Sequence, residues 1–179
     1  MMKNILCAGV GGQGVLTLGM VLAEAAANQG KYVTWLPEYG SEMRGGSASC
    51  KIKIGDEPII SPFMEEIDIL AALHKSPLEK YAALVEEGGI LMVESSLVHD
   101  LPDYPGRTVL RVPAVELAEK ISNPRGMSAV MVGAIIAASE ILPFDAALEA
   151  VASYYAYKKL PVEINKQAFI EGYQYIKSL

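Results

Sequence analysis

Residues 9–14 read Gly-Val-Gly-Gly-Gln-Gly, between the apolar run Ile5-Leu6-Cys7-Ala8 and an apolar, alanine-rich segment that begins at Val15. This order predicts a buried strand, a glycine turn and the start of a helix. Such a turn offers free backbone N–H groups and the positive end of the helix dipole to an anion. Glycine also allows tight packing without any ligand. The residues alone leave both roles open for Gly9, Gly11, Gly12 and Gly14.

Gln13 stands at the mouth of this helix, where the turn itself does not require an amide. We expect its side chain to be available for hydrogen bonds to a ligand or partner. In dinucleotide-binding proteins an acidic residue follows such a turn by about 20 residues, at the end of the second strand. Here Tyr32-Val33-Thr34-Trp35 occupies that place, and the next carboxylate, Glu38, lies beyond Pro37, where we expect the strand to stop. The sequence therefore disfavours a stand-alone dinucleotide-dependent enzyme.

Strand and helix patterns alternate along the chain. We expect strands at 3–8, 32–36, 47–54, 67–73, 90–93 and 108–112, helices at 15–28, 77–85 and 113–121, and a loop at 38–46. From residue 127 onward the pattern is helical in three pieces, broken near Pro143 and Pro161. The turn at 55–58 also indicates an antiparallel pair. These patterns predict one α/β domain over residues 1–179, with a Rossmann-like, mostly parallel sheet flanked by helices and a helical C-terminal third.

The composition limits the classes of function. A net charge of −6 argues against a general nucleic-acid or membrane-surface role. No apolar run reaches the roughly 18 residues that span a bilayer, and no signal peptide is recognisable, so we expect a cytoplasmic location. Cys7 and Cys50 lie in apolar, strand-like runs and are expected to be buried. Two thiols cannot supply the four cysteine ligands of an iron–sulfur cluster, and no spacing of ligands predicts a metal site.

A second segment carries a resemblance to a known family. Residues 34–46 read Thr-Trp-Leu-Pro-Glu-Tyr-Gly-Ser-Glu-Met-Arg-Gly-Gly. Together with the glycine turn, Ile59-Ile60-Ser61-Pro62 and Asn123-Pro124-Arg125, this segment resembles the gamma subunit of the 2-oxoacid:ferredoxin oxidoreductases, which act on pyruvate, ketoisovalerate or 2-oxoglutarate. It looks most like the branch for 2-oxoglutarate and similar oxoacids. Ser128 stands where the family usually has Asn, so the role of that Asn is not carried over to this chain.

The resemblance implies a subunit that is inactive alone. Its complex would oxidatively decarboxylate a 2-oxoacid, form acyl-coenzyme A and pass electrons to ferredoxin. Partner alpha and beta subunits would hold thiamine diphosphate, and a beta or delta subunit the iron–sulfur clusters. This chain would bind no cofactor alone and contribute no catalytic residue. The residues expected near the active site, coenzyme A or a partner are Gly9, Gly11, Gly12, Gln13, Gly14, Tyr39, Glu42, Arg44, Gly45, Gly46, Asn123 and Arg125.

Two segments have competing interpretations. The 38–46 loop is either a solvated scaffold in which Glu42 pairs with Arg44, or a site loop in which Arg44 presents its planar guanidinium to a carboxylate or phosphate. The run Tyr154-Tyr155-Ala156-Tyr157 with Lys158-Lys159 fits contact with a phosphate-bearing cofactor, and fits a solvated helix end equally well.

Overall fold

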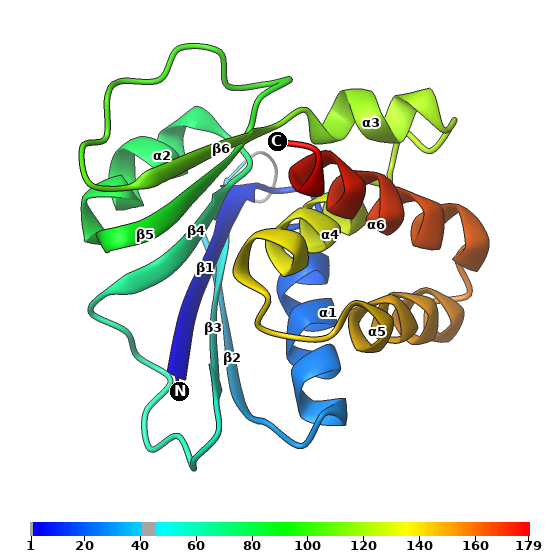
Figure 1. Ribbon diagram of the computed structural model, residues 1–179, viewed down its shortest axis with the longest axis horizontal. Coiled ribbons are helices and arrows are strands. Elements are labelled where there is room, and N and C mark those ends of the chain that lie inside the picture. The colour runs from blue at the N-terminus through cyan, green and yellow to red at the C-terminus, as the bar shows by residue number, and fades with distance from the viewer. Residues whose placement is uncertain (1, 41–45) are drawn as a thin grey trace.

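A six-stranded sheet forms the central layer of the part of the chain that the structure describes. The computed structural model describes residues 2–40 and 46–179. The strands lie in the order β2 (Tyr32–Tyr39), β3 (Ser47–Gly55), β1 (Met2–Val10), β4 (Ile67–Ala72), β5 (Val85–Glu94) and β6 (Thr108–Val112). The pairs β1–β4, β4–β5 and β5–β6 are parallel, whereas β3 is antiparallel to both β1 and β2. The predicted mostly parallel sheet is confirmed (Figure 1). The antiparallel edge is present, but the turn at 55–58 does not form a hairpin, because β3 pairs with β1 and β2 and is not a neighbour of β4.

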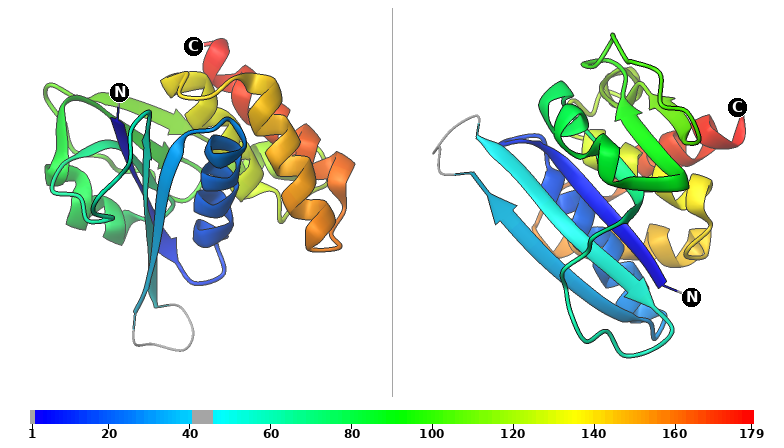
Figure 2. Two further views of the ribbon diagram at one scale, coloured as in Figure 1. Left: turned by 90° about the horizontal axis from the view of Figure 1, so that it is seen from below. Right: turned by 90° about the vertical axis from the view of Figure 1, so that its left-hand side faces the viewer.

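Helices cover the two faces unequally. One face packs against α1 (Val15–Asn28), α3 (Ala114–Lys120), α4 (Met127–Ser139), α5 (Phe144–Tyr157) and α6 (Val162–Lys177). The other face packs against α2 (Lys75–Tyr81) and the short 3₁₀ helix η1 (Ala82–Leu84). Figure 2 shows that β2 and β3 are left uncovered by helices on this second face. The predicted helical C-terminal third is confirmed, and Pro143 and Pro161 are the N-cap residues of α5 and α6.

Small residues bring the helices close to the sheet and to one another. A Cβ atom added at Gly19 of α1 would lie 2.3 Å from the sulfur of Cys50. A Cβ atom at Gly133 of α4 would lie 2.0 Å from the backbone oxygen of Phe169 in α6. Helices α4 and α6 therefore pack backbone against backbone. Cys7 and Cys50 are both fully buried in the core between the sheet and α1, as predicted.

The prediction that Pro37 ends the second strand is wrong. Strand β2 continues through Pro37 to Tyr39, so Glu38 lies inside the strand. A proline is tolerated here because β2 is an edge strand, where one side of the backbone needs no ladder hydrogen bond. Glu38 pairs with Lys51 at 2.7 Å, next to Ser49. In β3, Cys50 and Ile52 face α1 and the alternating Lys51 faces away, so this carboxylate lies on the face opposite the helix that the glycine turn begins.

None of the described helices is both long and apolar enough to cross a membrane.

Candidate functional site

The glycine turn connects β1 to α1 at the carboxyl edge of the sheet. Gly12 and Gly14 have φ angles of 93° and 75°, a backbone conformation that glycine adopts at no steric cost. The Gln13 side chain accepts a hydrogen bond from the Val10 backbone N–H at 2.8 Å and donates one to the Leu73 carbonyl at 2.9 Å. The expectation that the turn does not need this amide is therefore wrong, because Gln13 ties the end of β1 to the residue that follows β4.

This bridge lies at the switch in strand order. From β1 the chain passes to α1 on one face, and from β4 it passes to α2 on the other. Ligands of open α/β sheets bind outside the carboxyl ends of the strands at such a point. Gln13 thus holds the two diverging connections together, and the backbone of the turn is fixed without a ligand.

Gly46, the last residue of the segment predicted as the 38–46 loop, contacts the glycine turn. The Gly11 backbone N–H donates to the Gly46 carbonyl at 2.9 Å. Tyr39 ends β2 with 73% of its surface exposed. Glu42, Arg44 and Gly45 lie outside the described residues, so their predicted roles stay predictions.

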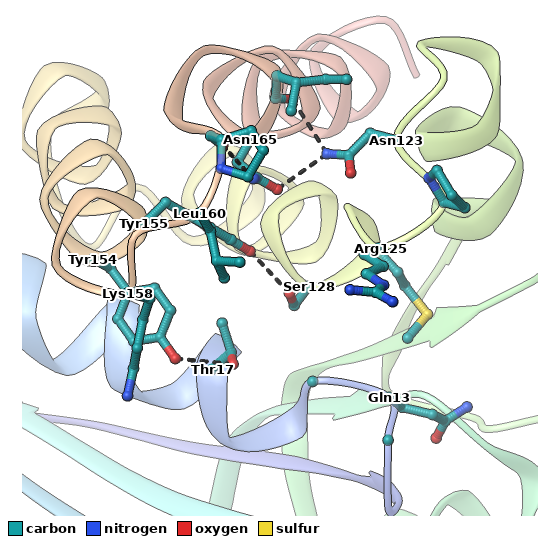
Figure 3. A pocket seen from close by; sticks show the side chains of 16 residues that line it. Gln13, Thr17, Asn123, Arg125, Ser128, Tyr154, Tyr155, Lys158, Leu160 and Asn165 are labelled. Carbon is teal, nitrogen blue, oxygen red and sulfur yellow. Dashed lines mark hydrogen bonds between the residues drawn. The ribbon is translucent and has the colours of Figure 1, made fainter.

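A cavity of about 530 Å³ opens beside the turn, on the face of the sheet that carries α1. We call it the carboxyl-edge cavity (Figure 3). Its walls come from the start of α1, the segment that leads into α4, the end of α5 and the start of α6. The lining residues are Gly12, Gln13, Gly14, Thr17, Asn123, Pro124, Arg125, Met127, Ser128, Tyr154, Tyr155, Lys158, Leu160, Pro161, Ile164 and Asn165.

The cavity collects only some of the predicted site residues. Gly12, Gln13, Gly14, Asn123 and Arg125 line it. The other predicted residues that the structure describes do not line it: Gly9, Gly11, Tyr39 and Gly46. No sequence motif marks Thr17, Met127, Leu160, Ile164 and Asn165 as site residues, and Pro161 is predicted only as a break between helices. Three residues of the 154–159 region, Tyr154, Tyr155 and Lys158, line the cavity. Their position agrees with the interpretation in which this region contacts a ligand.

An amide pair fixes the Asn-Pro-Arg segment. Asn123 Nδ2 donates to Asn165 Oδ1 at 3.0 Å, and Asn165 Nδ2 donates to the Pro161 carbonyl at 2.6 Å. Both asparagines are buried. Because this pair anchors the segment to the start of α6, the exposed Arg125 is carried on a fixed backbone at the rim.

Two hydroxyl pairs connect the remaining walls. The Ser128 and Tyr155 hydroxyls lie 3.3 Å apart, and those of Thr17 and Tyr154 lie 3.1 Å apart. Burial raises the pKa of Tyr155, so its hydroxyl stays neutral at physiological pH. A Cβ atom at Gly14 would lie 3.1 Å from Ser128 Oγ, so the beginnings of α1 and α4 are in contact. The small Ser128 side chain, in place of the family's usual Asn, fits this contact.

Most of the charge at the cavity wall is positive, although the C-terminal end of α5 adds partial negative charge beside Lys158. Helices α1, α4 and α6 all begin at its wall, and no side chain caps any of the three. Their first N–H groups carry partial positive charge. Arg125 and Lys158 add two full charges. Among residues 2–40 and 46–179, neither has a carboxylate partner and no acidic side chain lines the cavity. This arrangement is suited to binding an anion.

Comparison with known proteins agrees with the motifs. The sequence pattern of the family described as pyruvate ferredoxin/flavodoxin oxidoreductase matches residues 4–175. The ketoisovalerate oxidoreductase subunit VorA of Methanothermobacter thermautotrophicus is 34% identical over 177 residues, which cover 97% of this chain and 36% of VorA. The chain thus spans about a third of the length of this curated relative.

Two solved structures share the fold. The crystal structure of a keto/oxoacid ferredoxin oxidoreductase gamma subunit from Geobacter sulfurreducens has a TM-score of 0.86 and 30% identity, and the match covers 99% of this chain and 98% of that one. The 2-oxoglutarate:ferredoxin oxidoreductase from Magnetococcus marinus, solved with 2-oxoglutarate, coenzyme A and succinyl-CoA bound, has a TM-score of 0.89 and 22% identity. There the match covers 99% of this chain and 31% of that one, and it shows the fold alone.

The family pattern extends over nearly the whole chain, through the glycine turn, Asn123-Pro124-Arg125 and the start of α6. The chain belongs to the pyruvate ferredoxin/flavodoxin oxidoreductase family.

Proposed function

We propose that the chain is the gamma subunit of a 2-oxoacid:ferredoxin oxidoreductase, and that its carboxyl-edge cavity binds the phosphate-bearing end of coenzyme A. Membership of the family and the full-length likeness to the Geobacter gamma subunit support the first part. Alpha and beta subunits, with or without a delta subunit, would hold thiamine diphosphate and the iron–sulfur clusters, and ferredoxin would accept the electrons. The 34–46 segment favours 2-oxoglutarate or a similar oxoacid as substrate.

One observation carries the second part. Among the residues that the structure describes, Arg125 and Lys158 have no carboxylate partner, and they share a cavity with three helix N-termini that lack a side-chain cap and with no described carboxylate. Coenzyme A presents a pyrophosphate and a phosphate monoester at one end, whereas its reactive thiol is at the other. A chain that holds the phosphates can direct the thiol towards a partner subunit without supplying a catalytic group. The Magnetococcus marinus enzyme was solved with coenzyme A and succinyl-CoA bound, which fits this assignment.

Each wall has a distinct task in this proposal. The guanidinium of Arg125 makes paired hydrogen bonds to phosphate oxygens, and the N–H groups at the starts of α1 and α4 supply further donors. The hydroxyls of Ser128 and Tyr155 are neutral and hydrogen-bonded, so they shape the floor without adding charge. The subunit contributes binding and orientation, and the acyl transfer takes place in the partner subunits.

The test is calorimetric titration of the assembled complex with coenzyme A. We expect Arg125→Ala to weaken binding by about tenfold or more, because hydrogen bonds to charged groups contribute roughly 1.5–3 kcal/mol. Lys120→Ala is the matched control, since Lys120 is an exposed cation on the same face that does not line the cavity. Unchanged affinity in Arg125→Ala would leave the subunit a scaffold. Tighter binding of NAD, NADP or FAD than of coenzyme A would favour a dinucleotide-binding protein instead.

A further inference from the structure

The two cations of the carboxyl-edge cavity occupy different walls. Arg125 comes from the segment before α4, and Lys158 comes from the end of α5. Figure 3 shows them on opposite sides of Thr17 and Ser128. A ligand that contacts both walls can present one anionic group to each cation.

The Arg125 wall is rich in backbone donors. The first turns of α1 and α4 meet there, at Gly14 and Ser128, and neither helix has a side-chain cap. Several backbone N–H groups and a planar guanidinium can donate hydrogen bonds to the acceptor oxygens of two linked phosphates, as in a pyrophosphate.

The Lys158 wall has a different chemistry. Its ammonium lies 5.8 Å from the centre of the Tyr154 ring and 5.6 Å from that of Tyr157, which is 81% exposed. The two rings hold the ammonium by cation–π attraction, and no carboxylate of the described residues neutralises it. Lysine is a compact point charge, which suits a terminal phosphate with about two negative charges better than a bridging diester with one.

We propose that Lys158 forms a separate subsite for a terminal phosphate monoester, and that this subsite selects coenzyme A over its 3′-dephosphorylated form. The inference rests on the proposed function, because it assigns the pyrophosphate of coenzyme A to the Arg125 wall and the phosphate monoester of the same ligand to the Lys158 wall. Lys158 is then a specificity-determining residue, whereas Arg125 holds the part that both ligands share.

The matched variants are Lys158→Gln and Lys159→Gln. Both remove one charge and keep a polar side chain of similar length, but Lys159 does not line the cavity. The assembled complex is titrated with coenzyme A and, separately, with dephospho-coenzyme A. We expect the wild type to prefer coenzyme A by about tenfold, which corresponds to roughly 1.4 kcal/mol. Lys158→Gln should remove this preference by weakening coenzyme A alone, and Lys159→Gln should leave both affinities unchanged.

Other outcomes separate the two proposals. If Lys158→Gln weakens both ligands equally, or weakens neither, the subsite does not exist, although coenzyme A binding itself stands. If the wild type binds neither ligand, the proposed function fails and the subsite fails with it. Arg125→Ala should weaken both ligands by a similar factor, and a selective loss of coenzyme A in that variant would place the monoester at Arg125 instead. The melting temperature of each variant shows whether the fold is intact.

Discussion

A cavity lies at each edge of the sheet, and the two cavities differ in whether their cations are paired with carboxylates. The carboxyl-edge cavity has about 530 Å³ and two cations that have no carboxylate partner in the described part of the chain. At the amino edge, a cavity of about 410 Å³ is lined by Lys3, Lys31, Ile54, Gly55, Asp56, Ser139, Glu140 and Ile141. There each cation has a carboxylate: Lys3 pairs with Asp68 at 2.6 Å, Lys31 pairs with Asp56, and the nearby Lys177 pairs with Glu140 at 2.7 Å.

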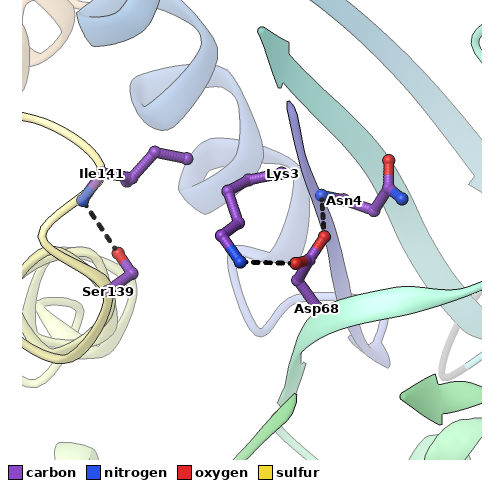
Figure 4. A network of polar contacts seen from close by, with 5 residues as sticks. All are labelled: Lys3, Asn4, Asp68, Ser139 and Ile141. Atoms are coloured by element: carbon purple, nitrogen blue, oxygen red, sulfur yellow. Dashed lines mark hydrogen bonds and ion pairs between the residues drawn. The ribbon is translucent and has the colours of Figure 1, made fainter. Parts of the chain in front are cut away.

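Figure 4 shows the centre of the amino-edge network. Asp68 of β4 accepts from the Lys3 ammonium and from the Asn4 backbone N–H, so one carboxylate joins two strands. The two cavities have similar volumes, so size does not distinguish the two edges. The difference lies in charge compensation: the cations at the amino edge pair with carboxylates of this chain, whereas Arg125 and Lys158 at the carboxyl edge have no carboxylate partner among the described residues.

The largest effect is expected from a substitution in α4, because this helix contributes residues to both cavities. Helix α4 begins at the carboxyl-edge cavity with Met127 and reaches the amino-edge cavity with Ser139. In Gly133→Ala, the new Cβ would lie 2.0 Å from the Phe169 carbonyl oxygen, so α4 and α6 must separate. We expect a loss of about 3 kcal/mol or more in the free energy of unfolding, measured by urea denaturation, with loss of coenzyme A binding. An unchanged denaturation midpoint would show that the helices adjust freely.

A change at the amino edge alone should separate stability from binding. Asp68→Ala leaves the Asn4 N–H and the Lys3 ammonium without their shared acceptor, and the Asp68 side chain is only 12% exposed. We expect a loss of about 1–2 kcal/mol in the free energy of unfolding, discounted because Lys3 is partly solvated. The affinity for coenzyme A should be unchanged. Weakened binding in this variant would mean that the two edges are coupled.

The smallest expected effect concerns an exposed pair. Hydrogen bonding to Lys31 is the largest cause that lowers the pKa of Asp56, from 3.8 to about 2. Because the folded-state pKa is depressed, the stabilisation by Asp56 is present above pH 4 and is lost as the pH falls towards 2. An NMR titration of the Asp56 carboxyl should give a midpoint near 2, and Lys31→Gln should raise it. A midpoint near 4 in the wild type would show that the pair does not persist in solution.

Local patterns predicted most of the fold. The α1 boundaries follow from the glycine turn before Val15 and from Gly30, which has a positive φ of 71°. The error at Pro37 has a global cause. Proline is excluded from central strands but tolerated in edge strands. Which strand lies at the edge depends on the pairing of distant strands, so the local pattern around Pro37 could not predict that β2 continues.

The site was less accessible to prediction for a related reason. The glycine turn and Asn123-Pro124-Arg125 carry local signals, but Gln13 makes one of its hydrogen bonds with Leu73, 60 residues away. The wall formed by Tyr154, Tyr155 and Lys158 depends on how α5 packs on α1, and such packing has no signature in the sequence of either helix.

The position of β3 determines how the sheet can assemble in time. Strand β3 lies between β1 and β2, although it follows both in the chain. The β2–β3 hairpin can form from local contacts within about 10 μs. Strand β1, in contrast, finds both of its neighbours downstream, and the first of them ends at Gly55. At a synthesis rate of about 5–20 residues per second, roughly 2–10 s pass between the completion of β1 and that of β3, so β1 can pair only after this delay.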